Sequence, residues 1–328
     1  MKRRELLALP GLFPALAQPQ APGKAAPAPP APESDEIIRV GIDLVNVFFS
    51  VRDKKNALVP TLTRDDLEVY EDGVKQTLKS FTRETDLPLT IGLLVDVSPS
   101  QEALIETERR AADAFFQTVL KKRDMAFLLS FGAEAELIQD LTSSPKILQQ
   151  SLQTLRVNAS AATVFNGGAI PGNARGTVLF DAVYLAANEK LKSEVGRKVL
   201  VLITDGVDSG SRVKVREAID AAHQSDAIIY SIYYFDPRAY GGYHTFGVSD
   251  ADLRKMSDDT GGRVFRVDRR LGLPEIFQQI ESELRTQYAV SYTSANSKKD
   301  GAFRKLELRP KDKSLKAQAR RGYFAPKA

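Results

Sequence analysis

The sequence predicts an α/β fold with an additional small β module built from the two ends of the chain. Two observations lead to this prediction. Between about residues 87 and 286, apolar strand-like runs alternate with amphipathic helical stretches. Residues 36–86 and 287–328, in contrast, show alternating strand-like patterns rich in β-branched and aromatic residues. Continuous apolar strands separated by amphipathic helices are typical of a parallel sheet covered on both faces.

Each element of the central region is visible in the sequence. The predicted strands are "LTIGLLVDV", "MAFLLSFG", "KVLVLITDG", "AIIYSIYYF" and "GRVFRV". The predicted helices are "LIETERRAADAFFQTVL", "VLFDAVYLAANEKL", "VKVREAIDAAHQ" and "LPEIFQQIESEL". We therefore expect a Rossmann-like, mostly parallel sheet with helices on both faces, in which ligands bind beyond the carboxyl ends of the strands.

The flanking segments predict strands joined by turns. Asp72-Gly73 lies between two strand-like runs, and this dipeptide is a strong hairpin signal. The C-terminal segment alternates in the same way around a turn rich in Lys, Asp and Gly. Because neither segment has enough strands to be stable alone, we expect residues 36–86 and 287–328 to pack together as one sandwich-like module.

The N-terminus resembles an export signal. Residues 1–17 have a basic start, a short apolar run and a small-x-small site at Ala15-Leu16-Ala17, which predicts a cleaved signal peptide. The apolar run is too short to span a bilayer, so no transmembrane segment is expected after cleavage. Residues 18–35 predict a Pro/Ala-rich linker. The expected location is periplasmic, at the cell surface or secreted; a disordered tail and twin-arginine export remain alternatives.

The composition excludes several classes of site. The formal net charge is +4, and removal of residues 1–17 leaves 43 basic and 41 acidic residues. This balance predicts no nucleic-acid partner. The chain has no cysteine and two histidines. Disulfides and thiolate metal sites are therefore excluded, and the two histidines are too few for a histidine-rich metal site.

Polar oxygen groups gather where the predicted strands end. Asp96, Ser98 and Ser100 follow one strand at alternate positions, Asp205 follows another, and Thr177 precedes a helix. Because the carboxyl ends of parallel strands share one edge of a sheet, we expect these five side chains to converge. Carboxylates and hydroxyls are oxygen ligands suited to Mg²⁺, with Mn²⁺ and Ca²⁺ as alternatives.

These five residues carry a family resemblance. Asp96-x-Ser98-x-Ser100, Thr177 in "GTVLFDA" and Asp205 in "TDG" resemble the metal-ion-dependent adhesion site of the von Willebrand factor type A domain. The resemblance covers about 200 central residues. The flanking "VYEDGVKQ" and "RRGYFAP" are similar to segments of an acidobacterial group of exported proteins that carry this domain.

The resemblance implies a non-enzymatic module that binds protein. The two serines and the threonine would contact the metal, and the aspartates would often act through water. Neutral hydroxyl ligands leave much of the metal's charge uncancelled, so an open position attracts a carboxylate of a partner protein.

Three other interpretations remain open at this stage. The hydroxyl and acidic groups could cap helices instead of binding a metal. Asp96 could be the nucleophile of a magnesium-dependent phosphotransfer enzyme or hydrolase, although position 98 is Ser where a second acid would be expected. The chain could also be a passive envelope scaffold with a structural metal site.

Two loops and two further acids were also considered. The glycine-rich residues 158–176 lead into Thr177 and either rim the site or have no contact role. Residues 236–250 present aromatic side chains that suit protein recognition or fold back on the domain. Asp181 is expected on a helix face and Asp208 in a solvated turn.

Overall fold

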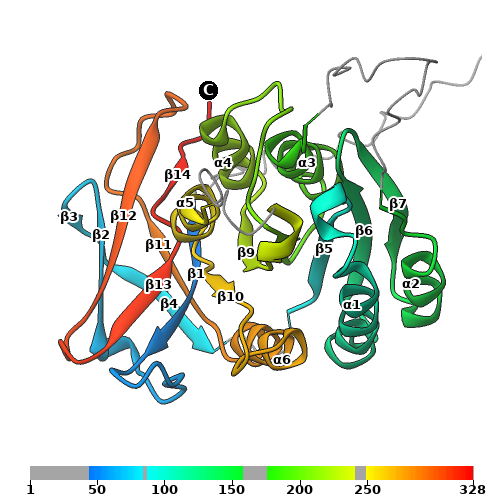
Figure 1. Cartoon of the computed structure of the whole chain (residues 1–328). Coiled ribbons are helices and arrows are strands. Elements are labelled where there is room, and N and C mark those ends of the chain that lie inside the picture. Colours follow the sequence, from blue (N-terminus) through cyan, green and yellow to red (C-terminus); the bar gives the residue numbers. More distant parts are fainter. Residues whose placement is uncertain (1–43, 84–86, 158–175, 241–248, 328) are drawn as a thin grey trace, which may run out of the picture. The chain divides into compact units, whose positions relative to one another are not determined.

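The computed structural model describes residues 44–83, 87–157, 176–240 and 249–327, which belong to one compact unit, Ile42–Ala328 (Figure 1). The predicted signal peptide, the linker, most of the glycine-rich loop and residues 241–248 lie outside the described residues. None of the helices in the described part is long and apolar enough to cross a membrane.

A six-stranded sheet forms the centre of the fold. Its order is β10-β9-β8-β5-β6-β7, and every neighbouring pair is parallel except β6 and β7. Its strands are β5 (Leu89–Asp96), β6 (Met125–Phe131), β7 (Ala135–Thr142), β8 (Arg197–Thr204), β9 (Ala227–Tyr233) and β10 (Val264–Arg266). All residues of β5 and β8 are buried, as expected for central strands covered on both faces.

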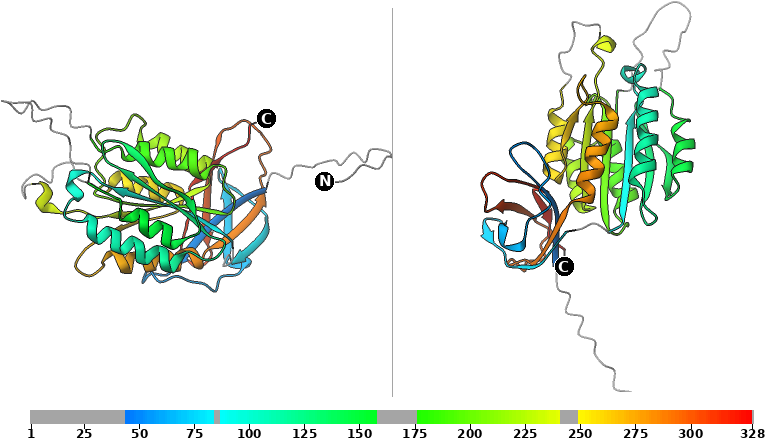
Figure 2. Two further views of the ribbon diagram at one scale, coloured as in Figure 1. Left: turned by 90° about the vertical axis from the view of Figure 1, so that its right-hand side faces the viewer. Right: turned by 90° about the horizontal axis from the view of Figure 1, so that it is seen from below.

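Helices cover both faces of this sheet (Figure 2). One face packs against α1 (Ile105–Val119), α2 (Pro145–Leu152) and α6 (Leu273–Arg285). The other packs against α3 (Leu179–Leu185), its continuation η3 (Ala186–Leu191), α4 (Val215–Gln224) and α5 (Ala251–Thr260). The predicted fold class is confirmed, whereas β7, α2 and α5 were not anticipated.

Two further sheets of four strands contain both ends of the described chain. One has the order β13-β1-β11-β4, and the other β14-β12-β2-β3. The first consists of β1 (Leu44–Arg52), β4 (Leu78–Arg83), β11 (Tyr288–Thr293) and β13 (Lys316–Ala319). The second consists of β2 (Leu67–Glu71), β3 (Val74–Lys75), β12 (Phe303–Pro310) and β14 (Gly322–Phe324). A single apolar core, which includes Val47, Val69 and Val290, draws on both sheets, so the β module expected from the flanking strands is confirmed.

The hairpin predicted at Asp72-Gly73 joins β2 to β3. Glu71 pairs with Val74, and the two turn residues have φ values of 48° and 83°. Both angles lie in the left-handed region that a two-residue primed turn requires, which explains the choice of Asp and Gly.

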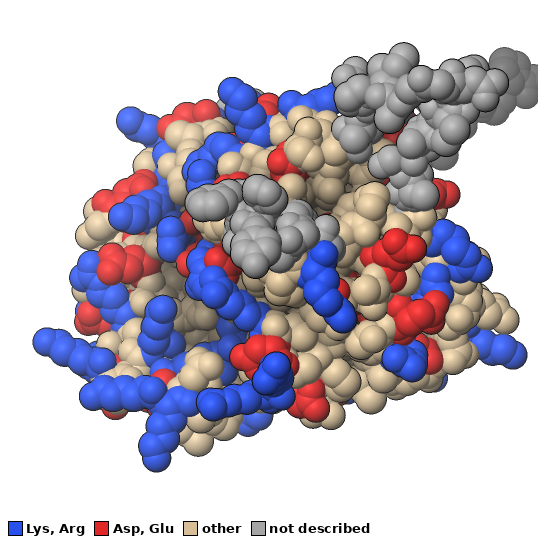
Figure 3. Space-filling view, viewed as in Figure 1, with Lys and Arg blue, Asp and Glu red and all other residues tan. Residues whose placement is uncertain are grey.

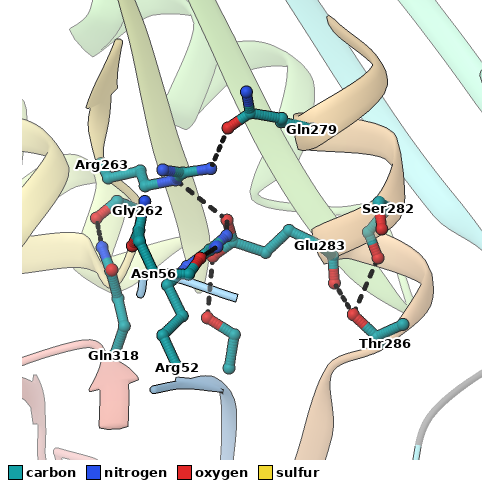
Figure 4. A network of polar contacts seen from close by, with 10 residues as sticks. Arg52, Asn56, Gly262, Arg263, Gln279, Ser282, Glu283, Thr286 and Gln318 are labelled. Atoms are coloured by element: carbon teal, nitrogen blue, oxygen red, sulfur yellow. Dashed lines mark hydrogen bonds and ion pairs between the residues drawn. The ribbon is translucent and has the colours of Figure 1, made fainter. Parts of the chain in front are cut away.

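A buried ion network joins the β module to α6 (Figure 4). The side chain of Glu283 is fully buried and accepts hydrogen bonds from Arg52 Nη2 of β1 at 2.5 Å and from Arg263 Nε at 3.1 Å. Ser50 Oγ donates to the other carboxylate oxygen at 2.8 Å. One acid on α6 therefore satisfies donors from the β module and from the loop before β10.

Charge is distributed unevenly along the chain. Residues 44–83 and 287–327 contain 18 basic and 9 acidic residues, whereas residues 87–286 contain 23 and 26. Figure 3 shows Lys and Arg side chains gathered at the lower left, where Figure 1 places strands of the β module. Part of this excess is paired locally, as in Lys75 with Glu68 at 2.6 Å and Arg309 with Glu307 at 2.7 Å.

Candidate functional site

The order of the strands creates a crevice between β5 and β8. After β5 the chain passes through α1 on one face to β6, whereas α4, which follows β8, packs on the opposite face. The two loops therefore leave the sheet in opposite directions at their shared carboxyl edge. This is a topological switch point, where ligands of open α/β sheets bind. Asp96 ends β5 and Asp205 directly follows β8, so the two predicted carboxylates flank this crevice.

Hydrogen bonds connect the two strand ends. Ser100 Oγ donates to Asp205 Oδ2 at 2.6 Å, and Ser98 Oγ lies 3.0 Å from Ser100 Oγ. The Ser98 backbone N–H donates to Asp96 Oδ1 at 2.9 Å, and Thr204 Oγ1 donates to Asp96 Oδ2 at 2.6 Å. Hydrogen bonds thus connect Asp96, Ser98, Ser100 and Asp205, which are four of the five predicted residues. Thr204, which was not predicted, also belongs to this network.

Thr177 reaches the same region through backbone contacts. Its carbonyl oxygen accepts hydrogen bonds from the N–H groups of Ser209 at 3.0 Å and Gly210 at 3.1 Å, which lie in the loop after Asp205. The side chain of Thr177 is buried, at 8% exposure. In the described part of the chain, no hydrogen bond joins the Thr177 hydroxyl to the other four predicted residues. The backbone of Thr177 therefore contacts the loop after Asp205, but its hydroxyl is not linked to the other predicted ligands.

Two acids expected to be peripheral hold these loops together. Asp181 Oδ1 accepts from the backbone N–H groups of Arg212 at 2.9 Å and Val213 at 3.0 Å. Asp208 Oδ1 accepts from Ser211 Oγ at 2.6 Å. Asp208 is partly exposed in the loop after β8, in keeping with a turn residue, but its Oδ1 also accepts hydrogen bonds within the fold. Asp181 does lie on α3, but its carboxylate also ties that helix to the loop after β8.

Helix capping does not account for the serines. The short 3₁₀ turn η2 (Pro99–Gln101) has Ser98 at its N-cap, and α1 has Leu104, but neither cap forms a side-chain hydrogen bond. The α3 N-cap is Val178, also without a side-chain bond. The hydroxyls of Ser98 and Ser100 therefore face each other and Asp205 instead of the free N–H groups of a helix.

Burial and mutual charge make the site electrostatically unusual. Asp96 is fully buried, and this burial, followed by the nearby charge of Asp205, raises the pKa of the Asp96 carboxyl to about 7. Among the described residues Asp96 forms no ion pair with a basic side chain. Two buried carboxylates at the ends of neighbouring strands form an environment that a cation stabilises.

The donor set fits a divalent cation with a preference for oxygen. Asp96 and Asp205 supply carboxylates, and Ser98, Ser100 and Thr177 supply hydroxyls, all within one edge of the sheet. Within the described ranges, no group of three or more His, Cys, Asp and Glu residues has the spacing of a metal site. A metal bound here would consequently depend on hydroxyls as well as acids.

The sheet order, its antiparallel edge strand and the motif at the switch point agree with the fold that the resemblance to the von Willebrand factor type A domain implies. No protein family model matches the chain, and no curated protein matches it.

Several solved structures are similar to the chain. A von Willebrand factor type A protein from Catenulispora acidiphila is 11% identical, with a TM-score of 0.48, and the match covers 80% of this chain and 74% of that one. The conserved hypothetical protein BatB from Bacteroides thetaiotaomicron is 17% identical, with a TM-score of 0.44, covering 60% and 97%. Proximal thread matrix protein 1 of the mussel byssus, described with a zinc-occupied MIDAS motif, is 14% identical, with a TM-score of 0.49, covering 64% and 49%. These scores lie below 0.5, so the fold assignment rests on the topology of the chain itself.

One described cavity lies away from this site. It has a volume of ≈ 440 Å³ and is lined by residues at the amino ends of β8 and β9 and by residues of the β module, including Lys198, His223 and Arg320. None of the five predicted site residues lines it.

The predicted set of site residues did not include three polar residues that lie near the site. Thr204 holds Asp96, and Gln101 and Glu108 are buried behind the motif, at 0% and 1% exposure. A signal for Glu108 was present, since an acid occupies the apolar face of the helix "LIETERRAADAFF".

Proposed function

We propose that this protein is an exported, non-enzymatic module that binds a partner protein through a metal-ion-dependent adhesion site. Asp96, Ser98, Ser100, Thr177 and Asp205 would hold Mg²⁺, or alternatively Mn²⁺ or Ca²⁺. The partner would contribute an acidic side chain. The single observation that carries the proposal is the hydrogen bond from Ser100 to Asp205, which joins the ends of β5 and β8 at the switch point of the sheet.

The chemistry of the donor set supports this function. A bound divalent cation supplies an open coordination position and a positive charge that only two nearby carboxylates offset. The hydroxyl oxygens of Ser98 and Ser100 lie 3.0 Å apart at the start of the 3₁₀ turn η2, so a single cation would contact both. Thr204 Oγ1 donates to Asp96 Oδ2 at 2.6 Å and so holds that carboxylate in place.

The environment of Asp96 argues against the phosphotransfer alternative. A nucleophilic carboxylate needs an oxygen that a substrate can reach. Asp96 is fully buried, and its two oxygens accept hydrogen bonds from the Ser98 N–H and the Thr204 hydroxyl. This arrangement favours a positioning role for Asp96 over covalent catalysis.

Export is part of the proposal and rests on the N-terminal sequence. Residues 1–17 have the features of a signal peptide, and the Pro/Ala-rich residues 18–35 would separate the folded part from the envelope. A periplasmic, surface or secreted location would expose the site to millimolar divalent cations and to other envelope proteins.

A binding experiment with matched variants tests the proposal. Immobilised protein would be incubated with extracts of the native envelope in Mg²⁺ or in EDTA, and captured proteins would be identified by mass spectrometry. We expect one or more partners that bind the wild type only in Mg²⁺ and that are lost with Ser98→Ala. The control Glu102→Ala changes an exposed acid beside the motif and should retain them. Equal capture in Mg²⁺ and EDTA would favour the passive scaffold instead.

A further inference from the structure

The first turns of α1 bury an acid that no other group satisfies. Glu108 is 1% exposed, and neither of its carboxylate oxygens has a hydrogen-bond partner in the described structure. Its helical neighbours Ile105, Ala112 and Phe115 belong to the apolar core beneath the sheet. An acid at such a position costs free energy unless something offsets it, because both its charge and its lone pairs are removed from water.

A second buried acceptor without a partner lies in the short turn before α1. Gln101 is fully buried, and its side-chain carbonyl oxygen also lacks a partner, while its amide only reaches the Tyr234 carbonyl oxygen at 3.5 Å. Burial, followed by the charges of Asp96 and Asp205, raises the pKa of Glu108 well above its usual range. The acid is therefore close enough to both proposed metal ligands to feel their charges.

Backbone hydrogen bonds tie Glu108 to the motif. Its N–H donates to the Leu104 carbonyl oxygen at 3.0 Å, the Leu104 N–H to that of Gln101 at 2.8 Å, and the Gln101 N–H to that of Ser98 at 2.9 Å. A basic side chain would be the ordinary remedy, but no ion pair reaches Glu108 within the described residues. Glu108 also does not form a direct ligand group with Asp96 and Asp205, since no three acids in the described part of the chain have metal-binding spacing.

We propose that Glu108 is an outer carboxylate of the cation site, acting on the cation through water from beneath the Asp96-x-Ser98-x-Ser100 motif. This inference rests on the proposed function, because it requires a cation at that site. With a cation bound, the ionised form of Glu108 would add a third negative charge to a ligand set that is otherwise rich in hydroxyls. Glu108 therefore helps the chain hold its cation before any partner contributes a carboxylate.

This role makes opposite predictions for the metal-free and the metal-bound protein. Without metal, Glu108 is an unsatisfied acid, so Glu108→Gln should leave the unfolding temperature the same or higher; the amide also supplies donors to the surplus acceptors. With metal, the same substitution removes a favourable charge. A residue with only a packing role would change both states in the same direction.

The experiment measures metal affinity and thermal unfolding side by side. Mg²⁺ and Mn²⁺ are titrated calorimetrically into the wild type, Glu108→Gln, Glu108→Leu and the control Glu102→Gln, which changes an exposed acid in the same region. We expect both Glu108 variants to bind about tenfold more weakly, as is typical when an outer-sphere partner is lost. We expect Glu102→Gln to match the wild type. In EDTA, neither Glu108 variant should unfold at a lower temperature than the wild type.

The outcomes separate this inference from the proposed function. Wild-type affinity in both Glu108 variants overturns the inference and leaves the metal site intact. Loss of folding or a lower unfolding temperature for both variants in EDTA also overturns it, because Glu108 would then stabilise the fold without metal. A wild-type protein that binds neither cation overturns the inference and the proposed function together.

Discussion

Ser100 Oγ donates a 2.6 Å hydrogen bond to Asp205 Oδ2, although the two residues are 105 positions apart in the chain. The bond crosses from the end of β5 to the residue after β8, and these strands lie side by side in parallel. A hydroxyl motif on one loop and an acid on another therefore form one polar site. That site is the basis of the following predictions.

Removal of single hydroxyl groups should weaken metal binding and leave the fold intact. Ser98→Ala and Thr177→Ala each delete one proposed ligand at the sheet edge, where the loss of a local hydrogen bond costs about 1 kcal/mol of stability. Calorimetric titration with Mg²⁺ should show lower affinity for both variants, with circular dichroism spectra like that of the wild type. Ser282→Ala, an exposed serine on α6, is the control for the same chemical change. Unchanged affinity in both site variants would exclude hydroxyl ligation.

Disruption of the Glu283 network should destabilise the protein strongly. Glu283→Gln removes the charge that pairs with Arg52 and Arg263, both largely buried, and leaves two cations without a full partner. Breaking a buried ion pair from one side typically costs about 3–5 kcal/mol. Urea unfolding should show a loss of this order, whereas Glu281→Gln on the same helix should change stability by less than about 0.5 kcal/mol. Similar midpoints for the two variants would show that the network contributes little.

His223 should make the protein less stable in mild acid. Burial, and then the charges of Arg320 and Arg216, lower the pKa of His223 to about 4, below its ordinary value of 6.5. The unfolded state then binds more protons than the folded state between these values, so the contribution of His223 to stability is lost as the pH falls from about 6.5 to about 4. The total effect is on the order of 3 kcal/mol.

A comparison with His223→Phe isolates this effect. The ring of His223 packs edge-on against Phe303 at 5.2 Å between centroids, and an aromatic replacement keeps much of that contact. Unfolding free energies measured from pH 4 to pH 7 should fall more steeply toward acid for the wild type than for the variant. Parallel curves would show that His223 titrates normally.

Removal of the last strands should loosen the first one. Residues 316–328 contain β13, which pairs with β1 from Phe49 to Arg52, and β14, which pairs with β12. Deletion of these residues would leave the hydrogen-bonding groups of that β1 edge unpaired. Hydrogen exchange should then be faster for the amides of residues 49–52 than in the full chain. Full protection there would mean that β1 holds its conformation without the C-terminal strands.

The sequence predicted best the elements whose local residue pattern matches their position in the folded protein. β5 and β8 are continuous apolar runs because both of their faces are covered, and the hairpin at Asp72-Gly73 follows from the φ values that its turn requires. β7 escaped prediction because its residues are only partly buried at the edge of the sheet, and "AELIQDLT" has no clear period. α5 was hidden because its segment is mostly polar.

The site was partly predictable for a related reason. The alternate spacing of Asp96, Ser98 and Ser100 and the strand before Asp205 determine where those groups lie once the sheet forms. The roles of Asp181 and Asp208 depend on loops that approach each other only in the folded chain, so their hydrogen bonds leave no local pattern. Glu108 is the informative exception, because an acid on an apolar helix face signals a tertiary partner.

The most direct test of the account is a calorimetric titration of Mg²⁺ into the folded wild type and into Asp96→Ala. Asp96 is the buried carboxylate at the centre of the proposed site, bonded to the Ser98 N–H and to Thr204. The account predicts measurable binding to the wild type, which EDTA reverses, and no detectable binding to a variant that remains folded by circular dichroism. Equal Mg²⁺ affinity in the two proteins would contradict the metal site and the adhesion mechanism that depends on it.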